Sequence, residues 1–223
     1  MIFRHTNHMC RRINLFLGLA RTGLLSQHWF MDVKLHEQET DLTGKILIAM
    51  PSIGDERFTN AVILICAHAE DFAMGLILNK PITGVTLPDL LEQLDVETDI
   101  DMPELAVLDG GPVGQDRGFV LHSEDFNCDR ATMHIGDNLC LTATRDALHA
   151  IASSHPPERA VLALGYSGWG AGQIEVELSQ NAWLVADCDP DIVYAQNHED
   201  KWRAALDQLG ISPAFLQTEG GHA

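Results

Sequence analysis

The sequence predicts an α+β protein: a single compact domain with a bent mixed or antiparallel β-sheet surrounded by helices. Short apolar runs that suit strands alternate irregularly with segments whose apolar residues recur at helical spacing. Several neighbouring runs are joined by short polar or glycine-containing turns, as in hairpins, rather than by repeated βαβ crossovers. The 223 residues are 46% apolar and 21% charged, which is ordinary for a globular chain and sufficient for a buried core.

Three apolar runs predict the first strands, at residues 45–50, 61–66 and 74–79. The second run is continuously apolar and rich in β-branched side chains, which is typical of a strand buried on both faces. A polar turn at 68–71 separates the second run from the third. These two runs therefore predict a central hairpin.

A helix is predicted at residues 87–94, where four leucines follow the i, i+3, i+4, i+7 spacing of one apolar face. Thr86, with Asp89 three residues later, resembles a capping box, and Pro88 suits a first helical turn. The beginning of this helix is therefore defined by local chemistry.

The remaining elements follow from the same patterns. Strands are predicted at 105–109, 117–122, 160–164 and 182–186, and helices at 143–153 and 202–209. Ile174, Val176 and Leu178 alternate with two glutamates, which predicts a half-buried strand. Gly210 is expected to end the last helix.

A glycine-aromatic run, Leu-Gly-Tyr-Ser-Gly-Trp-Gly-Ala-Gly-Gln at 164–173, is the most distinctive feature of the chain. So much glycine predicts an unusual turn or a shaped surface, because glycine reaches positive φ and permits close backbone approach. Its first part resembles the G-x-S-x-G nucleophile elbow, but Trp169 replaces the final glycine and a strand is predicted next. We therefore predict a structural turn, and no nucleotide-binding loop.

Cys66 and His68 are the best candidates for thiol chemistry. Residues i and i+2 of a strand share a face, and a neighbouring imidazolium can stabilise a thiolate. The alternative, which we favour, is a buried strand cysteine with a histidine in the adjoining turn.

A second candidate site combines three turns that could gather around one groove for an anion or a peptide. Its residues are Asn79, Lys80, Asp109, Gly110, Gly111, Tyr166, Ser167 and Trp169. Asp109 could be a base or a cation ligand, but a carboxylate that accepts from the backbone amides of its own turn is the simpler interpretation.

The net charge of −18 argues against several classes of partner. Direct binding of nucleic acid depends on Lys and Arg, and anionic membranes disfavour so acidic a chain. We expect an unknown protein partner or a small ligand, with no membrane and no nucleic acid. The oligomeric state stays open.

Cysteine and histidine spacing predicts no cofactor and no metal site. The five cysteines include no C-x-x-C pair, which indicates reduced thiols and a cytoplasmic location. The 11 histidines include no H-E-x-x-H arrangement. A metal site assembled from residues distant in the sequence remains an open alternative.

Residues 1–30 differ from the rest of the chain, because they contain four arginines and no acid. Three interpretations stand: a start codon placed too early, with Met31 the true first residue; a disordered native extension; or a targeting signal. Each places the segment outside the fold. We expect residues 31–41 to form a loose lead-in, residues 42–215 the domain and residues 216–223 a flexible tail.

Several blocks of sequence together resemble the YqgE/AlgH family of small bacterial proteins. They are Leu42-Thr43-Gly44, Ile48-Ala49-Met50-Pro51, Asn60-Ala61-Val62-Ile63, Cys66-Ala67-His68, Ala73 to Pro81, Gly110-Gly111-Pro112-Val113, Arg117 to His122, Gly165 to Glu175 and Asn181-Ala182-Trp183-Leu184. The resemblance implies a compact α+β domain in a cytoplasmic bacterial protein, and some members are described as transcriptional regulators. It supplies no catalytic or ligand residues, and Ala67 stands where the family usually has glutamate.

Three hypotheses of function follow. The first, which we favour, is a non-enzymatic binding or regulatory protein that acts on transcription, if at all, indirectly. The second is a thiol-dependent or hydrolytic enzyme that uses Cys66 with His68, or Ser167. The third is a scaffold whose role lies wholly in contacts with protein partners.

Overall fold

The apolar runs of the sequence fold into a ten-stranded sheet. The computed structural model describes residues 41–96, 98, 105–127, 131–143 and 145–216. The strands are β1 (Lys45–Ala49), β2 (Val62–Ala69), β3 (Phe72–Ile77), β4 (Pro81–Thr86), β5 (Ala106–Asp109), β6 (Val113–His122), β7 (Thr132–Gly136), β8 (Leu139–Thr142), β9 (Ala160–Gly170) and β10 (Trp183–Asp187). The predictions for residues 1–30, 31–41 and 216–223 lie outside the described residues, apart from Asp41 and Leu216.

The strand order is β10-β1-β2-β3-β9-β6-β8-β7, and β5 pairs with both β4 and β9. Only the β5–β9 pair is parallel among the pairings of the described strands. The sheet is therefore mixed but mainly antiparallel, and the α+β prediction is confirmed with more sheet than helix.

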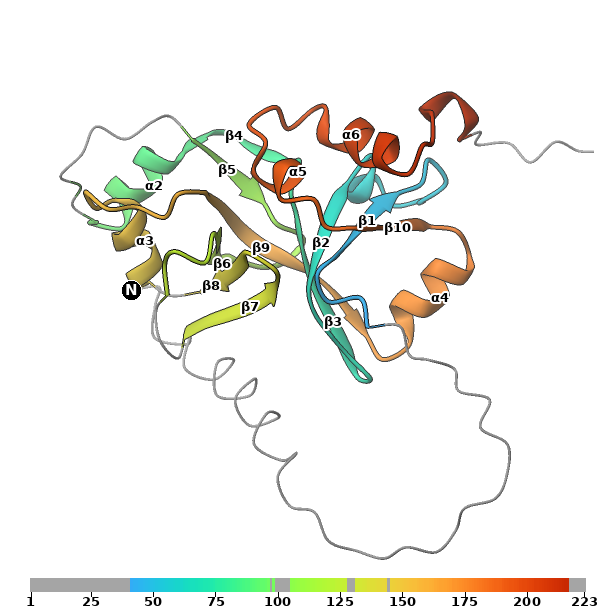
Figure 1. Ribbon diagram of the computed structural model, residues 1–223, viewed down its shortest axis with the longest axis horizontal. Helices are drawn as coiled ribbons and strands as arrows, with labels where there is room; N and C mark the ends of the chain where they lie inside the picture. The colour runs from blue at the N-terminus through green and yellow to red at the C-terminus, as the bar shows by residue number, and fades with distance from the viewer. Residues whose placement is uncertain (1–40, 97, 99–104, 128–130, 144, 217–223) are drawn as a thin grey trace, which may run out of the picture. The chain divides into compact units, whose positions relative to one another are not determined.

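Five α-helices and two short 3₁₀ helices belong to the described residues. They are η2 (Glu56–Phe58), α2 (Leu87–Gln93), α3 (Arg145–Ile151), α4 (Gln173–Ser179), α5 (Pro190–Tyr194), α6 (Lys201–Gln208) and η4 (Pro213–Phe215). Figure 1 shows α2 and α3 beside the group β4–β8, and α4, α5 and α6 beside β1–β3 and β10. No helix of the described residues is long and apolar enough to cross a membrane.

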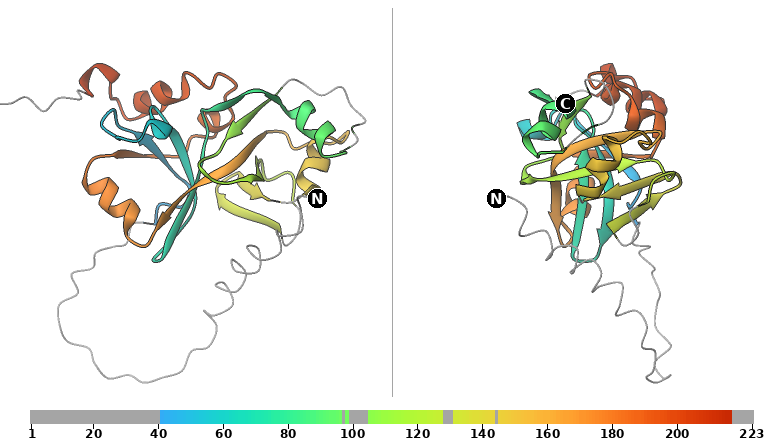
Figure 2. Two further views of the ribbon diagram at one scale, coloured as in Figure 1. Left: turned by 180° about the vertical axis from the view of Figure 1, so that it is seen from behind. Right: turned by 90° about the vertical axis from the view of Figure 1, so that its left-hand side faces the viewer.

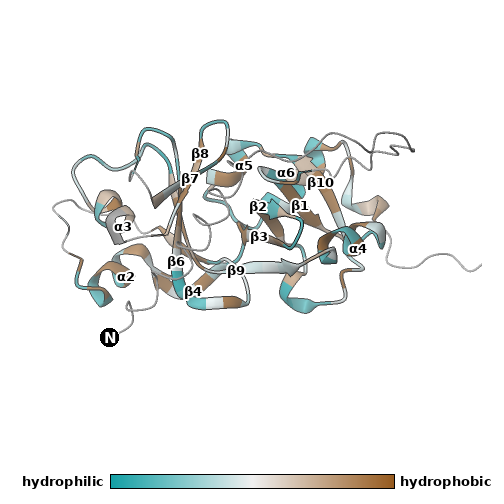
Figure 3. Ribbon diagram, turned by 90° about the horizontal axis from the view of Figure 1, so that it is seen from below, coloured by the Kyte–Doolittle hydropathy of each residue, from teal (hydrophilic) through white to brown (hydrophobic). Residues whose placement is uncertain are grey.

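Strand β9 runs through both groups of elements (Figures 1 and 2). Its first half pairs with β5 and β6, and its second half pairs with β3. Each group has its own core: one contains side chains of β1, β2 and Trp169, and the other contains Leu162 with apolar side chains of α2 and α3. In Figure 3, β1 and β2 are largely hydrophobic, whereas the second half of β9 is pale.

Most of the predicted elements are confirmed. Strands β2 and β3 form the expected antiparallel hairpin. At the start of α2, the Thr86 side chain accepts a hydrogen bond from the Asp89 amide, and the Asp89 carboxylate accepts from the Thr86 amide. The predicted capping box is therefore present. Gly210 follows α6 with a positive φ of 69°.

One predicted strand is wrong, because Gln173–Ser179 is the helix α4. Gly172, at φ 69°, turns the chain out of β9. The side-chain amide of Gln173 then donates to the carboxylate of Glu177, four residues later. Ile174 is buried, whereas Val176 is 54% exposed. Apolar residues at 174 and 178 fit a period of 3.6 as well as a period of 2, so this short alternation could not distinguish helix from strand.

Candidate functional site

The Gly110-Gly111 turn and the Gly165–Ser167 part of β9 meet in direct backbone contact. A Cβ on Gly110 would lie 2.3 Å from the Gly165 carbonyl oxygen, and one on Gly111 would lie 2.4 Å from the Ser167 nitrogen. Gly165, at φ +73°, would place its own Cβ 2.4 Å from the Gly111 carbonyl oxygen. We call Gly110, Gly111, Gly165 and Ser167 the glycine joint. The two predicted turns do converge, but they leave no room for even a methyl group between them.

Ser167 belongs to this joint and is not exposed. Ser167 is fully buried from solvent, and its hydroxyl donates a 3.4 Å hydrogen bond to the Gly110 carbonyl. The sequence argument against a nucleophile elbow used Trp169 in place of the final glycine and a following strand, and the second premise is wrong because α4 follows. The conclusion stands on burial instead, since an elbow serine must project above the sheet.

Cys66 and His68 do not form a hydrogen-bonded pair. The pairing of β2 with β3 shifts register between Ile65 and Ala67, and this bulge interrupts the alternation that would place i and i+2 on one face. The Cys66 thiol donates to the Leu64 carbonyl, and burial raises its pKa. A raised pKa disfavours the thiolate, which is the reactive form.

His68 is bonded to other parts of the domain. Its Nδ1 accepts from the Leu42 amide at 3.2 Å, and its Nε2 lies 2.9 Å from a carboxylate oxygen of Glu175 on α4. The imidazole therefore connects the segment before β1 with α4.

The polar residues of the predicted turns make local structural contacts. The Asn79 side chain accepts from the Val62 amide and donates to the Asn60 carbonyl. The Asp109 carboxylate accepts from the Gly111 amide at 3.1 Å, so it binds a backbone amide of its own turn. The backbone of Lys80 accepts from the Asp109 amide.

The two predicted aromatic residues pack within the fold. The Trp169 indole N–H donates to Glu177 at 2.9 Å, and its ring meets Trp183 edge-on at 6.2 Å. The Tyr166 ring makes a similar edge contact with Phe119. Both aromatic residues therefore take part in packing within the fold.

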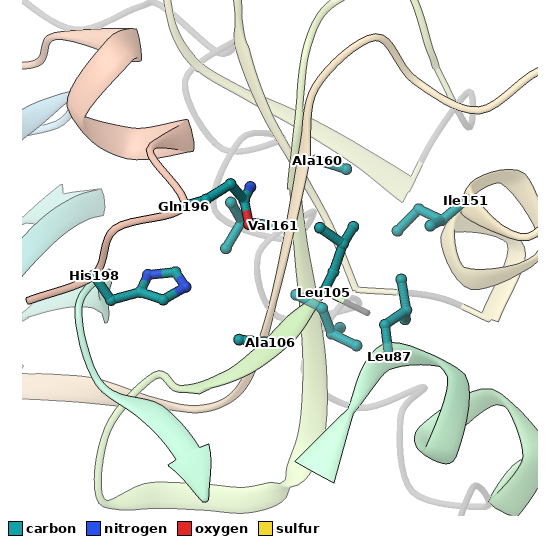
Figure 4. A pocket seen from close by; sticks show the side chains of 9 residues that line it. Leu87, Leu105, Ala106, Ile151, Ala160, Val161, Gln196 and His198 are labelled. Atoms are coloured by element: carbon teal, nitrogen blue, oxygen red, sulfur yellow. The ribbon is translucent and has the colours of Figure 1, made fainter. Parts of the chain in front are cut away.

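A pocket lies elsewhere, between the two groups of elements (Figure 4). Including the solvent at its mouth, it encloses about 370 Å³. Its walls come from α2, β5, α3, the beginning of β9 and the segment between α5 and α6. They are Leu87, Leu105, Ala106, Ile151, Ala160, Val161, Leu162, Gln196 and His198. None of the ten residues predicted from sequence lines it.

His198 supplies the pocket's unsatisfied polar atom. Figure 4 shows its imidazole directed toward Ala106 and Val161, and its buried Nδ1 has no hydrogen-bond partner. Burial, followed by the charge of nearby Lys201, lowers the pKa of this imidazole. The ring is therefore neutral at pH 7. A neutral imidazole has one acceptor nitrogen, and the unpartnered Nδ1 can take that role.

Lys201 is a fully buried cation beside this imidazole. Its ammonium group donates to the carbonyl oxygens of Leu78 at 2.9 Å and Val193 at 2.7 Å. Burial lowers its pKa to about 8. Neither His198 nor Lys201 was predicted from the sequence, because neither stands in a motif and both precede the apolar pattern of the last predicted helix.

Comparison with known proteins identifies the family of this chain. The sequence profile of the AlgH-like family matches residues 46–214. The chain belongs to this family. A UPF0301 protein of Nitrobacter hamburgensis is 49% identical over 189 residues, which cover 82% of this chain and 88% of that protein. One from Caulobacter vibrioides is 48% identical over 183 residues, covering 82% and 94%.

Two solved structures share the fold. The solution structure of the AlgH protein from Pseudomonas aeruginosa matches with a TM-score of 0.66 at 37% identity, over 89% of this chain and all of that one. A crystal structure of a Corynebacterium diphtheriae protein matches with a TM-score of 0.64 at 22% identity, over 80% and 92%. The second match supports the fold alone.

Proposed function

We propose that this chain is a non-enzymatic binding protein that accepts a small, mainly apolar ligand in the pocket beside His198. One observation carries the proposal: the pocket combines apolar walls with a single buried, unpartnered acceptor, His198 Nδ1. Ligand sites are typically apolar with a few polar groups that fix orientation.

The chemistry of the walls defines the ligand class. The ligand needs an apolar body to contact Leu105, Ile151 and Val161, and one hydroxyl or N–H group to donate to His198. A ligand without that donor would leave the imidazole nitrogen unsatisfied, which costs free energy in a buried site.

A regulatory role is consistent with the position of the pocket. Gln196 lines it and is also exposed, so the segment between α5 and α6 is at once a pocket wall and part of the outer surface. A ligand that contacts this segment would alter the surface offered to a protein partner. Any effect on transcription would then be indirect, in keeping with the chain's charge of −18.

The test compares two probes of closely similar shape, 4-methylphenol and p-xylene, titrated into the full chain and followed by amide chemical shifts. Saturable shifts at 105–106, 160–162 and 196–198 are expected for both probes. 4-Methylphenol should bind about fivefold to tenfold more tightly, because one hydrogen bond contributes about 1 kcal/mol.

Two variants provide the controls. His198→Phe keeps a ring but removes the acceptor, so the two probes should bind it equally. Ala106→Leu should block both, because Figure 4 shows the Ala106 methyl facing the pocket. The proposal fails if neither probe saturates, or if the shifts fall outside the pocket.

A further inference from the structure

A second arrangement of unassigned chemistry lies at the edge of the sheet, on the β7–β8 hairpin. His134 of β7 and Cys140 of β8 are direct cross-strand partners. Such partners place their side chains next to each other on one face of the sheet. The Cys140 sulfur is buried and lies 3.3 Å from His134 Nδ1, whereas the His134 side chain is 60% exposed.

Glu124, from the segment after β6, completes the group. Its Oε1 lies 3.7 Å from His134 Nδ1 and accepts a 3.2 Å hydrogen bond from the Asn138 amide in the hairpin turn. Asn138 adopts φ 59°, which directs the turn so that its N–H faces this carboxylate. The hairpin thus fixes both the carboxylate and the imidazole above the buried sulfur.

We propose that Glu124, His134 and Cys140 bind a divalent cation of the zinc class. The ligand atoms Oε1, Nδ1 and Sγ all lie within 4.8 Å of one another. In a tetrahedral site with bonds of about 2.0–2.3 Å, ligand atoms stand about 3.3–3.6 Å apart. The two separations from His134 Nδ1, 3.3 Å to the Cys140 sulfur and 3.7 Å to the Glu124 oxygen, are close to these values.

The mixture of ligand atoms selects the class of metal. Thiolate and imidazole suit Zn²⁺ and its neighbours, whereas Mg²⁺ and Ca²⁺ prefer oxygen alone. The described residues supply three ligands, so one tetrahedral position is left for water. With the sulfur buried and two ligands partly exposed, a metal could enter from solvent.

A simpler interpretation is a thiol–imidazole hydrogen bond beside an exposed ion pair. Such a bond needs only Cys140 and His134, and an exposed Glu–His pair contributes little. The two interpretations differ in one observable property: only a metal site uses the cysteine as a thiolate ligand while Glu124 contributes to affinity.

The experiment titrates the full chain with Co²⁺, which replaces zinc and gives thiolate-to-cobalt charge-transfer absorption. We expect one equivalent to produce this absorption and Zn²⁺ to displace it. Cys140→Ser should abolish the absorption. His134→Ala, at an exposed position that leaves the fold intact, should weaken Co²⁺ binding at least about tenfold, as should Glu124→Gln, which keeps the acceptor for Asn138.

Matched variants exclude three of the other four thiols, leaving out the buried Cys66. Cys10→Ser and Cys128→Ser, combined in one chain, should leave the absorption unchanged, as should Cys188→Ser. The proposal is overturned if no thiolate absorption develops, if the absorption survives Cys140→Ser, or if His134→Ala and Glu124→Gln bind Co²⁺ as tightly as the unmodified chain.

Discussion

The glycine joint differs from the two candidate binding regions, the pocket beside His198 and the β7–β8 hairpin, in whether its polar groups are free to bind a ligand. In the joint, Ser167 donates to Gly110, and backbone atoms fill the space that a side chain would need. In the pocket, His198 Nδ1 is buried with no partner. At the β7–β8 hairpin, three metal-ligating atoms face one another.

This contrast shows that a distinctive sequence motif can be required for backbone packing rather than for binding or catalysis. Gly110, Gly111 and Gly165 are required because two backbone segments cross within van der Waals contact. The polar groups that are free to bind, at His198 and at the β7–β8 hairpin, stand in stretches of sequence that contain no recognisable motif. Four predictions test this contrast, and they are given in order of decreasing expected effect on stability.

The largest effect is expected from Gly111→Ala. The new methyl group would lie 2.4 Å from backbone atoms of Tyr166 and Ser167, and the residue has φ +143°. Backbone must move to accommodate it, so we expect a loss of about 3 kcal/mol or more in the free energy of unfolding, measured with denaturant.

Gly170→Ala is the matched control, since a Cβ there meets nothing within 4 Å. It should change the free energy of unfolding by less than about 0.5 kcal/mol. Equal effects of the two substitutions would show that the joint is not uniquely crowded.

Glu177→Ala tests the same half of the domain. The Glu177 carboxylate accepts from the indoles of Trp169 and Trp183 at 2.9 and 2.8 Å, so its removal leaves two indole N–H groups unpaired. We expect a loss of about 2–3 kcal/mol in unfolding experiments. The neighbouring Glu175→Ala removes a mostly exposed carboxylate and should cost about 0.5 kcal/mol or less; similar losses would contradict the assignment.

Lys201 should make stability depend on pH beside the pocket. Its pKa is about 8 in the folded protein against 10.5 ordinarily, so between these values the unfolded chain holds a proton that the folded chain has released. The contribution of Lys201 to stability therefore rises with pH in this window, by about 1 kcal/mol per unit. The difference in unfolding free energy between the unmodified chain and Lys201→Met should rise with this slope, and parallel curves would refute it.

The smallest effect is expected from Thr86→Ala, which removes the cap of α2 and so loosens Leu87 in the pocket wall. The loss should be about 1 kcal/mol. Thr86→Ser keeps the hydroxyl and should retain most of the stability, so thermal melts of the two variants separate capping from packing. No difference between them would argue against the cap.

Local patterns predicted the elements whose signals are strong. The leucine stripe and the capping box defined α2, and continuous apolar runs defined β1, β2 and β3. The helix α4 was mistaken for a strand, because its seven residues fit both periods. The bulge at Cys66 also escaped prediction, since it depends on pairing with β3.

The candidate sites escaped prediction because distant segments build them. The pocket brings Leu87 together with Val161 and His198, and no spacing rule connects these positions. The β7–β8 hairpin did carry a signal, with Gly136-Asp137-Asn138 between two alternating runs. Recognising that turn would have placed His134 opposite Cys140, but not Glu124 above them.

The central claim is that the glycine joint and the neighbouring Cys66 serve only the structure. It is tested most directly by treating the folded full chain with iodoacetamide and a fluorophosphonate at neutral pH, then mapping adducts by peptide mass spectrometry. We predict no adduct at Cys66 or Ser167 until the chain is unfolded, because both side chains are buried. An adduct at either residue in the folded protein would contradict the account.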